Sequence, residues 1–220
     1  MSSKIDDYIA NRPRYDGFAD NLFWAYACWQ AFWVAVQDGE LKFGRKHFMI
    51  RAKFFKGYRE GKYHVTDLYR NNIAKMQCNN MCWYCQCELP ASELTADHVF
   101  PRVKGGSNDM DNIIFVCKHC NSSKGAKDMV EWFVERDQIP HYWLIGHYLK
   151  QVVQYAEENK LMNKDLDEVG AMELPFSIKS ILFFHNRNIW EYYLKILNTE
   201  ENINDLKPDI LMQNNQVIPQ

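Results

Sequence analysis

The sequence predicts a mainly α-helical protein in which a small α+β module is set between helical segments. Three observations carry this prediction. Apolar and aromatic side chains recur every three or four residues before residue 75 and again after residue 136, which is the spacing of one helix face. Six of the seven cysteines lie between residues 76 and 136, together with the only Gly-Gly pair and two short apolar runs typical of strands. Aromatic residues make up 15% of the chain, whereas Gly and Pro number only 10 and 7, so the composition is that of a folded protein.

These patterns divide the chain into four regions. Residues 1–75 are predicted to be helical and to contain a basic amphipathic helix. Residues 76–136 form the α+β module, and residues 137–198 form a second helical region. Residues 199–220, rich in Asn, Glu and Asp, are predicted to be a loose tail.

The N-terminal region contains a predicted helix without charged residues from Asn21 to Gln37. Its apolar side chains are spaced alternately four and three residues apart: Leu22, Tyr26, Trp29, Trp33 and Val36. The stretch has 17 residues, polar groups at both ends and Gln30 inside, and is therefore short for a membrane span. We predict a core helix and no contact with a membrane.

A second helix is predicted within residues 41–62, with its basic residues on one side. At about 100° per residue, one wedge of this helix holds Lys42, Arg45, Lys46, Lys53 and Lys56. A neighbouring apolar wedge holds Phe43, His47, Ile50, Phe54 and Tyr58. This basic wedge is a candidate contact for nucleic-acid phosphates, and a solvated basic face is the alternative.

Two helices are predicted after the module, at residues 141–160 and 177–197, with Pro140 and Pro175 before them. Residues 126–220 carry 9 Lys/Arg and 15 Asp/Glu, a net charge of −6. Residues 1–125 carry 17 Lys/Arg and 13 Asp/Glu, a net charge of +4. This difference places nucleic-acid contact in the first part of the chain and makes the acidic C-terminal helices a candidate docking surface for a protein partner.

The cysteine content bears on the cellular compartment. The first twenty residues contain no short apolar run that ends in a small-residue cleavage site, so no export signal is predicted. We therefore expect a cytoplasmic protein. In such a protein, seven cysteines are expected to bind metal or to remain thiols and not to form disulfides.

Four cysteines form two C-x-x-C pairs separated by 31 residues: Cys82/Cys85 and Cys117/Cys120. Each pair supplies two thiolates from one tight turn, and the two pairs together complete a tetrahedral Zn²⁺ site. A site of four thiolates has no open position, so this zinc is predicted to be structural. Replacement of one ligand by Cys87 or Cys78 is the alternative.

The segment between the cysteine pairs carries the other chemically active side chains. It contains, in order, a strand with adjacent Asp97 and His98, a Gly-Gly turn, and a second strand opened by Asn112. The second cysteine pair is followed by Asn121 and Lys124 in a predicted helix. The two predicted strands cover residues 94–101 and 112–116.

This arrangement resembles the HNH endonuclease family, the ββα-metal nucleases with a four-cysteine zinc site. The family pattern is a C-x-x-C, an Asp-His with a Pro three residues later, a Gly-Gly turn, an Asn, and a C-x-x-C followed by Asn or His and then Lys-Gly at a helix. Every element is present in this order from Cys82 to about Arg136, with Asn121 at the third family position, so the chain is an H-N-N variant. The resemblance implies a zinc-bound ββα nuclease finger that hydrolyses DNA with Mg²⁺ or Mn²⁺, and RNA is not excluded as substrate.

The resemblance also implies roles for individual residues. His98 would act as general base on water, since an imidazole takes up a proton near neutral pH. Asp97 and Asn121 would hold the divalent ion through hard oxygen atoms, with helix capping as the alternative for Asn121. Asn112 would pin the loop between the strands. Lys124, on the metal side of the helix, would contact the substrate phosphate.

Two details qualify this site. Adjacent residues of a regular strand point to opposite faces, so Asp97 and His98 diverge unless the strand end is distorted, as the resemblance implies. Arg102 and Lys104, in the following turn, are further candidates for phosphate contact, and ordinary solvated charges are the alternative.

Two other functions are compatible with the sequence. One is a zinc-stabilised nucleic-acid or protein interaction module without cleavage, against which the presence of Asp97, His98 and Lys124 argues. The other is a nuclease subunit that a partner protein activates, as in bacterial defence systems that use nucleases of this family. The acidic C-terminal helices would provide the contact with such a partner.

Overall fold

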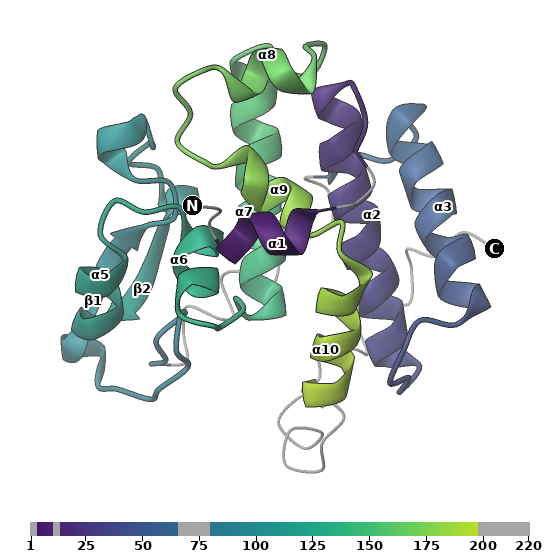
Figure 1. The fold of residues 1–220 in the computed structure, drawn as a ribbon. Coiled ribbons are helices and arrows are strands. Elements are labelled where there is room, and N and C mark those ends of the chain that lie inside the picture. Colours follow the sequence, from purple (N-terminus) through teal and green to yellow (C-terminus); the bar gives the residue numbers. More distant parts are fainter. Residues whose placement is uncertain (1–3, 11–13, 66–79, 198–220) are drawn as a thin grey trace.

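The computed structural model describes residues 4–10, 14–65 and 80–197, except for the side chains of residues 142, 143 and 197. This part of the chain is mainly helical, with one two-stranded antiparallel sheet at an edge of the molecule (Figure 1). The architecture confirms the predicted fold class. The predicted boundary between residues 75 and 76, Cys78 and the predicted tail lie outside the described residues.

The module lies in the sequence between two helical segments that pack on each other. Within the described residues the helical body comprises α1 (Lys4–Ile9), α2 (Phe18–Gln37), α3 (Arg45–Arg59), α7 (Tyr142–Glu158), α8 (Leu166–Gly170), α9 (Ile178–Phe183) and α10 (Arg187–Leu197). The module comprises β1 (Leu94–His98), β2 (Ile113–Cys117), α5 (Lys118–Lys124) and α6 (Met129–Glu135). Short 3₁₀ turns occupy Ala91–Glu93, Arg102–Lys104 and Met110–Asn112.

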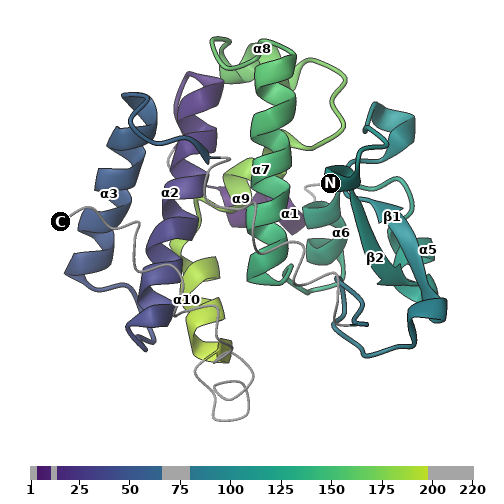
Figure 2. The same cartoon turned by 180° about the vertical axis from the view of Figure 1, so that it is seen from behind.

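Helix α2 is the centre of the helical body. It contacts α3 along one side and α7, α9 and α10 elsewhere on its surface (Figures 1 and 2). The ring of Phe32 packs on Trp190 and Tyr193 of α10, with centroids 5.2 and 5.7 Å apart. This aromatic packing confirms α2 as a core helix. None of the described helices is long and apolar enough to cross a membrane.

Helix α3 covers the predicted basic segment but is shorter than predicted. It begins after Gly44, whose backbone N–H donates to His47 Nδ1 at 3.0 Å. Tyr58 is buried against Phe23 and Tyr26 of α2. The predicted basic wedge forms an exposed α3 stripe, with Arg45, Lys46, Lys53 and Lys56 on the helix and Lys42 just before it. Figures 1 and 2 place α3 at the opposite edge of the molecule from the sheet, with α2 and α7 between them.

The C-terminal region departs from the prediction. Its first predicted helix is α7, but the second, residues 177–197, is two helices, α9 and α10. Trp190 Nε1 donates to the carbonyl of Phe184 at 2.8 Å, and Asn186 Oδ1 accepts the N–H of Asn188 at 3.0 Å. Asn186 therefore caps a new helix. The apolar spacing continues through the turn, so it does not reveal the break.

The module has the order strand, strand, helix. β1 pairs with β2 from Leu94 opposite Cys117 to His98 opposite Ile113, and α5 packs on both strands. The predicted first strand, residues 94–101, ends early at His98. Beyond it, Phe100 donates its N–H to the side chain of Asn112 and not to a strand partner.

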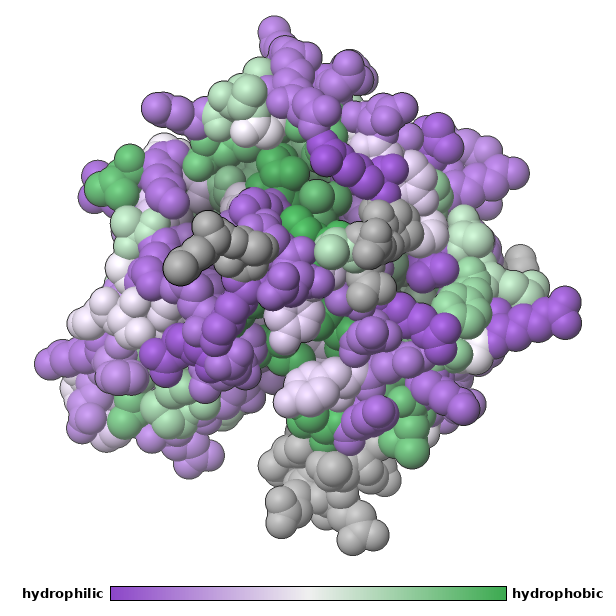
Figure 3. All heavy atoms as spheres, viewed as in Figure 1, coloured by the Kyte–Doolittle hydropathy of each residue, from purple (hydrophilic) through white to green (hydrophobic). Residues whose placement is uncertain are grey.

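A buried carboxylate connects the module to the helical body. Asp128 Oδ1 caps α6 by accepting two backbone N–H groups and also accepts the hydroxyl of Ser180 on α9 at 2.5 Å. Its Oδ2 accepts the hydroxyl of Tyr148 on α7 at 2.6 Å and the N–H of Ser177 at 3.0 Å. The surface outside such contacts is mostly polar on the face shown in Figure 3, with apolar side chains in smaller patches.

Candidate active site and metal centres

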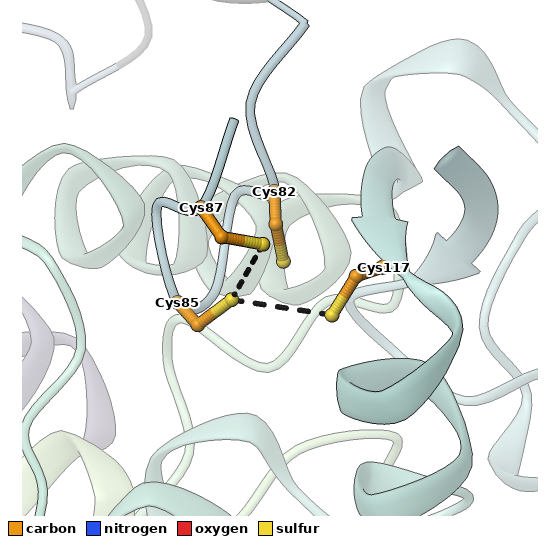
Figure 4. A group of neighbouring side chains, drawn as sticks. All are labelled: Cys82, Cys85, Cys87 and Cys117. Carbon is orange, nitrogen blue, oxygen red and sulfur yellow. Dashed lines mark hydrogen bonds between the residues drawn. The ribbon is translucent and has the colours of Figure 1, made fainter. Parts of the chain in front are cut away.

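The cysteine thiols gather where the loop before β1 meets the end of β2. The sulfur atoms of Cys82, Cys85, Cys87 and Cys117 all lie within 4.8 Å of one another (Figure 4). Cys85 Sγ is 3.3 Å from Cys87 Sγ and 3.9 Å from Cys117 Sγ. Four thiols this close suit a tetrahedral ion with metal–sulfur distances of about 2.3 Å, so the cluster is consistent with a zinc site.

Cys87 and Cys120 are the two candidates for the fourth ligand of the cluster. Cys87 belongs to the group of four, whereas the predicted ligand Cys120 does not. Cys120 is nevertheless buried beside the cluster, and its backbone N–H donates to Cys117 Sγ at 3.4 Å. The sulfur positions favour Cys87, the alternative ligand, and leave Cys120 as a fifth thiol next to the site.

The clustered thiols change one another's protonation. Burial, together with the side chains of Cys87 and Cys82, raises the pKa of Cys85 to about 12. The pKa of Cys117 is lowered to about 7 in spite of burial, because the N–H of Cys120 and the surrounding thiols donate to it. Several thiolates this close repel one another, so a bound cation is needed to keep them ionised together.

Asp97 of β1 is buried in the module and has both of its partners on one oxygen atom. Tyr84 Oη donates to Asp97 Oδ2 at 2.6 Å, and Lys124 Nζ lies 3.0 Å from the same oxygen. Within the described residues, Oδ1 receives no hydrogen bond. Asp97, at 8% exposure, is thus a buried carboxylate with one oxygen available to an ion.

Lys124 is buried inside the module. Its ammonium group was expected to meet the substrate phosphate, but the residue is 1% exposed. Lys124 Nζ pairs with Asp97 and donates to the backbone carbonyl of His98 at 2.9 Å. The ammonium is therefore engaged inside the module, and the phosphate contact stays a prediction. Its position three residues after Asn121 puts Lys124 on the same side of α5 as Asn121, where the buried carboxylate of Asp97 requires a counter-charge.

His98 lies at the end of β1, on the opposite face from Asp97. The ladder is regular up to the His98–Ile113 pair, so the strand-end distortion expected from the resemblance is absent up to that point of β1. The imidazole is half-buried, and its Nε2 is 3.0 Å from Oδ1 of Asn108 in the loop between the strands. Asn108 therefore orients the ring.

Asn112 holds the loop that carries Asn108. Its Oδ1 accepts the N–H of Phe100 at 2.8 Å, and its Nδ2 donates to the carbonyls of Phe100 and Ser107 at 3.0 and 2.8 Å. The loop is so tight that a Cβ at Gly106 would lie 1.9 Å from the carbonyl oxygen of Phe100. Asn112 thus stands where a loop-pinning residue is expected.

The amide oxygen of Asn121 on α5 accepts no hydrogen bond from the described residues. Its Nδ2 donates to Thr95 Oγ1 at 3.0 Å and to the carbonyl of Ala96 at 3.2 Å. A carbonyl oxygen only accepts hydrogen bonds, so the amide nitrogen must face β1 and Oδ1 is the free end. Cys117 caps α5, which excludes the helix-cap alternative for Asn121. Thr95 shares a strand face with Asp97, two residues further on.

The predicted phosphate-binding residues fall in two separate places. Arg102 and Lys104 are exposed in the turn after β1, on the loop that also holds Asn108. The α3 stripe lies across the molecule from the sheet (Figure 2). A duplex bound at the module reaches the first group directly, but it must extend around the molecule to reach the second.

Part of the α3 stripe is already paired within the protein. Lys46 Nζ lies 2.8 Å from a carboxylate oxygen of Asp38, and Lys56 Nζ lies 3.7 Å from Glu60. The other three members form no ion pair among the described residues: Lys42, Arg45 and Lys53. These three are the stronger candidates for a phosphate contact.

The sequence did not predict Tyr84 and Asn108 as site residues. The Tyr84 ring packs on Trp132 and Phe133 of α6, with centroids 5.1 and 5.8 Å apart. Burial, followed by the charge of Asp97, raises the pKa of Tyr84 well above its ordinary value, so the hydroxyl stays a donor at neutral pH. An aromatic residue inside a C-x-x-C turn carries no sequence signal for a contact with a later strand, and Asn108 is one of several polar loop residues.

Comparison with known proteins assigns the module to a family. Residues 82–130 match the family model described as HNH endonuclease. A segment of the chain is 33% identical over 101 residues to the CRISPR-associated endonuclease Cas9 of Corynebacterium diphtheriae. That match covers 43% of this chain and 9% of the relative. No solved structure was found to match. The chain therefore carries an HNH endonuclease domain at residues 82–130.

Proposed function

We propose that this protein is a metal-dependent endonuclease that hydrolyses DNA phosphodiester bonds at its HNH domain. The observation that carries the proposal is that Asp97 and His98, at the end of β1, and Asn121, on the helix α5 that packs on this strand, belong to one ββα unit. The similarity to a protein described as a CRISPR-associated endonuclease supports the same activity. It also supports a role in defence against foreign DNA.

The side chains of the site fit two different metals. Asp97 and Asn121 offer hard oxygen atoms, which suit Mg²⁺ or Mn²⁺. When bound, such an ion would act as a Lewis acid on the phosphoryl group. The cysteine cluster offers soft thiolates, which suit a separate Zn²⁺ that would support the fold.

His98 is the proposed general base. The contact of its Nε2 with Asn108 and the hydrogen bond from Lys124 to its backbone carbonyl hold the residue at the strand end. With Nε2 engaged, the other ring nitrogen can take the proton of the attacking water. The loop pinned by Asn112 would then orient the base before the substrate binds.

Plasmid cleavage with Mg²⁺ or Mn²⁺ tests the proposal. Replacement of a general base typically costs on the order of 10² to 10⁴ in rate. We expect that loss for His98→Ala at every metal concentration, with DNA binding retained. His119→Ala is the matched control, because His119 is exposed on α5 beside the same site, and it should cleave like the parent. Equal cleavage by His98→Ala and the parent would contradict the role of His98.

Partner activation is the second candidate. It is favoured by the net charge of −6 over residues 126–220, since an acidic segment suits a protein contact better than DNA. Weak cleavage that rises when a partner is added would support it. Inactivity of the parent toward DNA and RNA in all conditions would support an interaction module without cleavage.

The free cysteines accord with action in the cytoplasm.

A further inference from the structure

Asp97 uses only one of its two oxygen atoms within the described protein. Oδ2 accepts the hydroxyl of Tyr84 and forms an ion pair with Lys124 Nζ, whereas Oδ1 has neither kind of partner among the described residues. We infer that Tyr84 and Lys124 are positioning residues that occupy Oδ2, leave Oδ1 as the single carboxylate oxygen for the divalent ion, and make that ion bind firmly only together with a substrate phosphodiester. This inference rests on the proposed nuclease function.

Both donors are fixed in place. The Lys124 side chain is 0% exposed, and its ammonium also donates to the carbonyls of His98 at 2.9 Å and Gly125 at 3.4 Å. Tyr84 is 3% exposed and packs on Trp132 of α6. Neither side chain can move aside without leaving buried polar groups unpaired, which is unfavourable. Oδ2 is therefore not free to turn toward an ion.

The zinc site helps to hold Tyr84 in this position. Tyr84 lies inside the Cys82–Cys85 turn, whose sulfur atoms belong to the thiol cluster. A metal that gathers these sulfur atoms fixes the turn and thereby the direction of the Tyr84 hydroxyl. The structural cluster and Asp97 are thus linked through one side chain.

The charges of the ion site cancel in the free protein. The negative charge of Asp97 is matched by Lys124 at 3.0 Å, and the amide of Asn121 is neutral. The affinity of oxygen ligands for a divalent ion rises with the number of charged ligands. An ion held by one neutralised carboxylate and one amide is therefore held weakly.

A phosphodiester supplies what the free site lacks. It carries one negative charge, and its non-bridging oxygen atoms are hard ligands of the kind that Mg²⁺ takes from substrates in many enzymes. With DNA present, the ion gains a charged ligand while the protein ligands stay unchanged. Ion and substrate should therefore increase each other's affinity by the same factor.

Mn²⁺ binding to the zinc-loaded full chain tests the inference. Isothermal titration is performed with Mn²⁺ alone and again with a DNA duplex of about 12 base pairs, roughly 40 Å at 3.4 Å per base pair, in the His98→Ala background that keeps the duplex uncut. We expect a dissociation constant on the order of 10⁻³ M without DNA, as for sites with few charged ligands. With the duplex, binding should tighten at least about tenfold.

Variants of the two donors separate positioning from general stability. Lys124→Met removes the counter-charge and should tighten Mn²⁺ binding to the DNA-free protein at least about tenfold. Lys124→Arg keeps the charge and should leave binding weak. Tyr84→Phe removes one donor from Oδ2 and should tighten binding by a smaller factor, which keeps the test informative if Lys124→Met does not fold.

Tyr148→Phe is the matched control for Tyr84→Phe. It removes a hydroxyl that bonds a buried aspartate, Asp128, at the same distance of 2.6 Å, but in the helical body. It should lower stability and leave Mn²⁺ binding unchanged. Micromolar Mn²⁺ binding without DNA, or no effect of DNA on it, would overturn the inference and leave the nuclease proposal standing. Absence of Mn²⁺ binding both with and without DNA would overturn both.

Discussion

Two buried aspartates show how the module and the helical body use the same group in different ways. Asp97 and Asp128 are 8% and 4% exposed, and each accepts a tyrosine hydroxyl at 2.6 Å. Asp128 accepts five neutral donors, distributed over both oxygen atoms. Asp97 accepts one hydroxyl and forms an ion pair with one ammonium, both at Oδ2.

The difference separates a structural carboxylate from a candidate ligand. Asp128 has its hydrogen-bonding capacity filled by groups of α6, α7 and α9, so it ties these elements together and has little room for an ion. Asp97 is nearly as buried, but among the described residues no group donates a hydrogen bond to its Oδ1, so this oxygen is available to an ion. Burial alone would not distinguish the two residues, whereas the distribution of donors does.

The largest expected effect is that of zinc removal, which should unfold the module and spare the body. Structural zinc contributes about 10–16 kcal/mol of binding free energy in small zinc-finger peptides. We expect about one zinc per chain, and its removal by a chelator or by Cys117→Ser should abolish hydrogen-exchange protection in residues 82–125. Protection in α2 and α7 should persist, because their core is aromatic and aliphatic.

Cysteine variants provide the controls for this experiment. Cys28→Ser changes a buried cysteine of α2 outside the cluster and should leave the zinc content unchanged. Cys87→Ser and Cys120→Ser identify the fourth ligand, since only the ligand variant should lose zinc affinity. Retained protection of residues 82–125 in fully zinc-free protein would contradict the structural role of the cluster.

A smaller effect is expected from the charge pair, and it tests the comparison of the aspartates directly. Asp97→Asn leaves the buried Lys124 ammonium without a counter-charge, which should cost about 3–5 kcal/mol of stability. Lys124→Met should cost a similar amount for the converse reason. The double variant should lose much less than the sum of the two, as chemical denaturation of all four proteins would show.

For Asp128, a second substitution at one of its partners should restore little of the lost stability. Asp128→Asn places amide hydrogens against donors from several elements, so its loss of stability is shared among neutral hydrogen bonds. Combination with Tyr148→Phe should therefore recover only about 1 kcal/mol. Equal recovery in the two pairs would show that the aspartates do not differ as proposed.

The module could be predicted from sequence because its chemistry is local. The spacing of the cysteine pairs, the Asp97-His98 dipeptide and Asn112 all lie within one short segment, and the structure brings them into one ββα unit. The role of Lys124 could not be predicted in the same way. Its position in the helix places the Lys124 side chain on the same side as Asn121. Only the packed structure shows that its ammonium group is buried and paired with Asp97.

Features that depend on distant contacts were also missed. Tyr84 meets Asp97 only because the cysteine turn folds against β1 and α6. The break between α9 and α10 depends on Asn186, whose side chain caps α10. The same side chain donates a hydrogen bond to the carbonyl of Tyr8, which lies near the N-terminal end of the sequence. Apolar periodicity carries no information about such partners.

The smallest expected effect concerns the two groups of basic residues and requires substrates of two lengths. Arg102 and Lys104 belong to the module, whereas Lys42, Arg45 and Lys53 lie at the opposite edge of the molecule (Figure 1). A duplex of about 12 base pairs is roughly 40 Å long at 3.4 Å per base pair. If it binds at the module, it should depend on the first group alone.

Charge reversal to Glu in the α3 stripe should therefore leave the affinity for the short duplex unchanged. For a long duplex, loss of three phosphate contacts would reduce the slope of log affinity against log salt by up to about 2.7, at about 0.9 per contact. The Arg102→Glu, Lys104→Glu variant should weaken both substrates, and its slope should fall by up to about 1.8. Fluorescence anisotropy over a salt series measures both quantities, and unchanged unfolding midpoints exclude a loss of folding.

Weaker binding of the short duplex by the α3 variant would mean that DNA approaches the molecule from the α3 edge. An unchanged slope with the long duplex would mean that the stripe is a solvated face, and the nucleic-acid contacts would then be confined to the module.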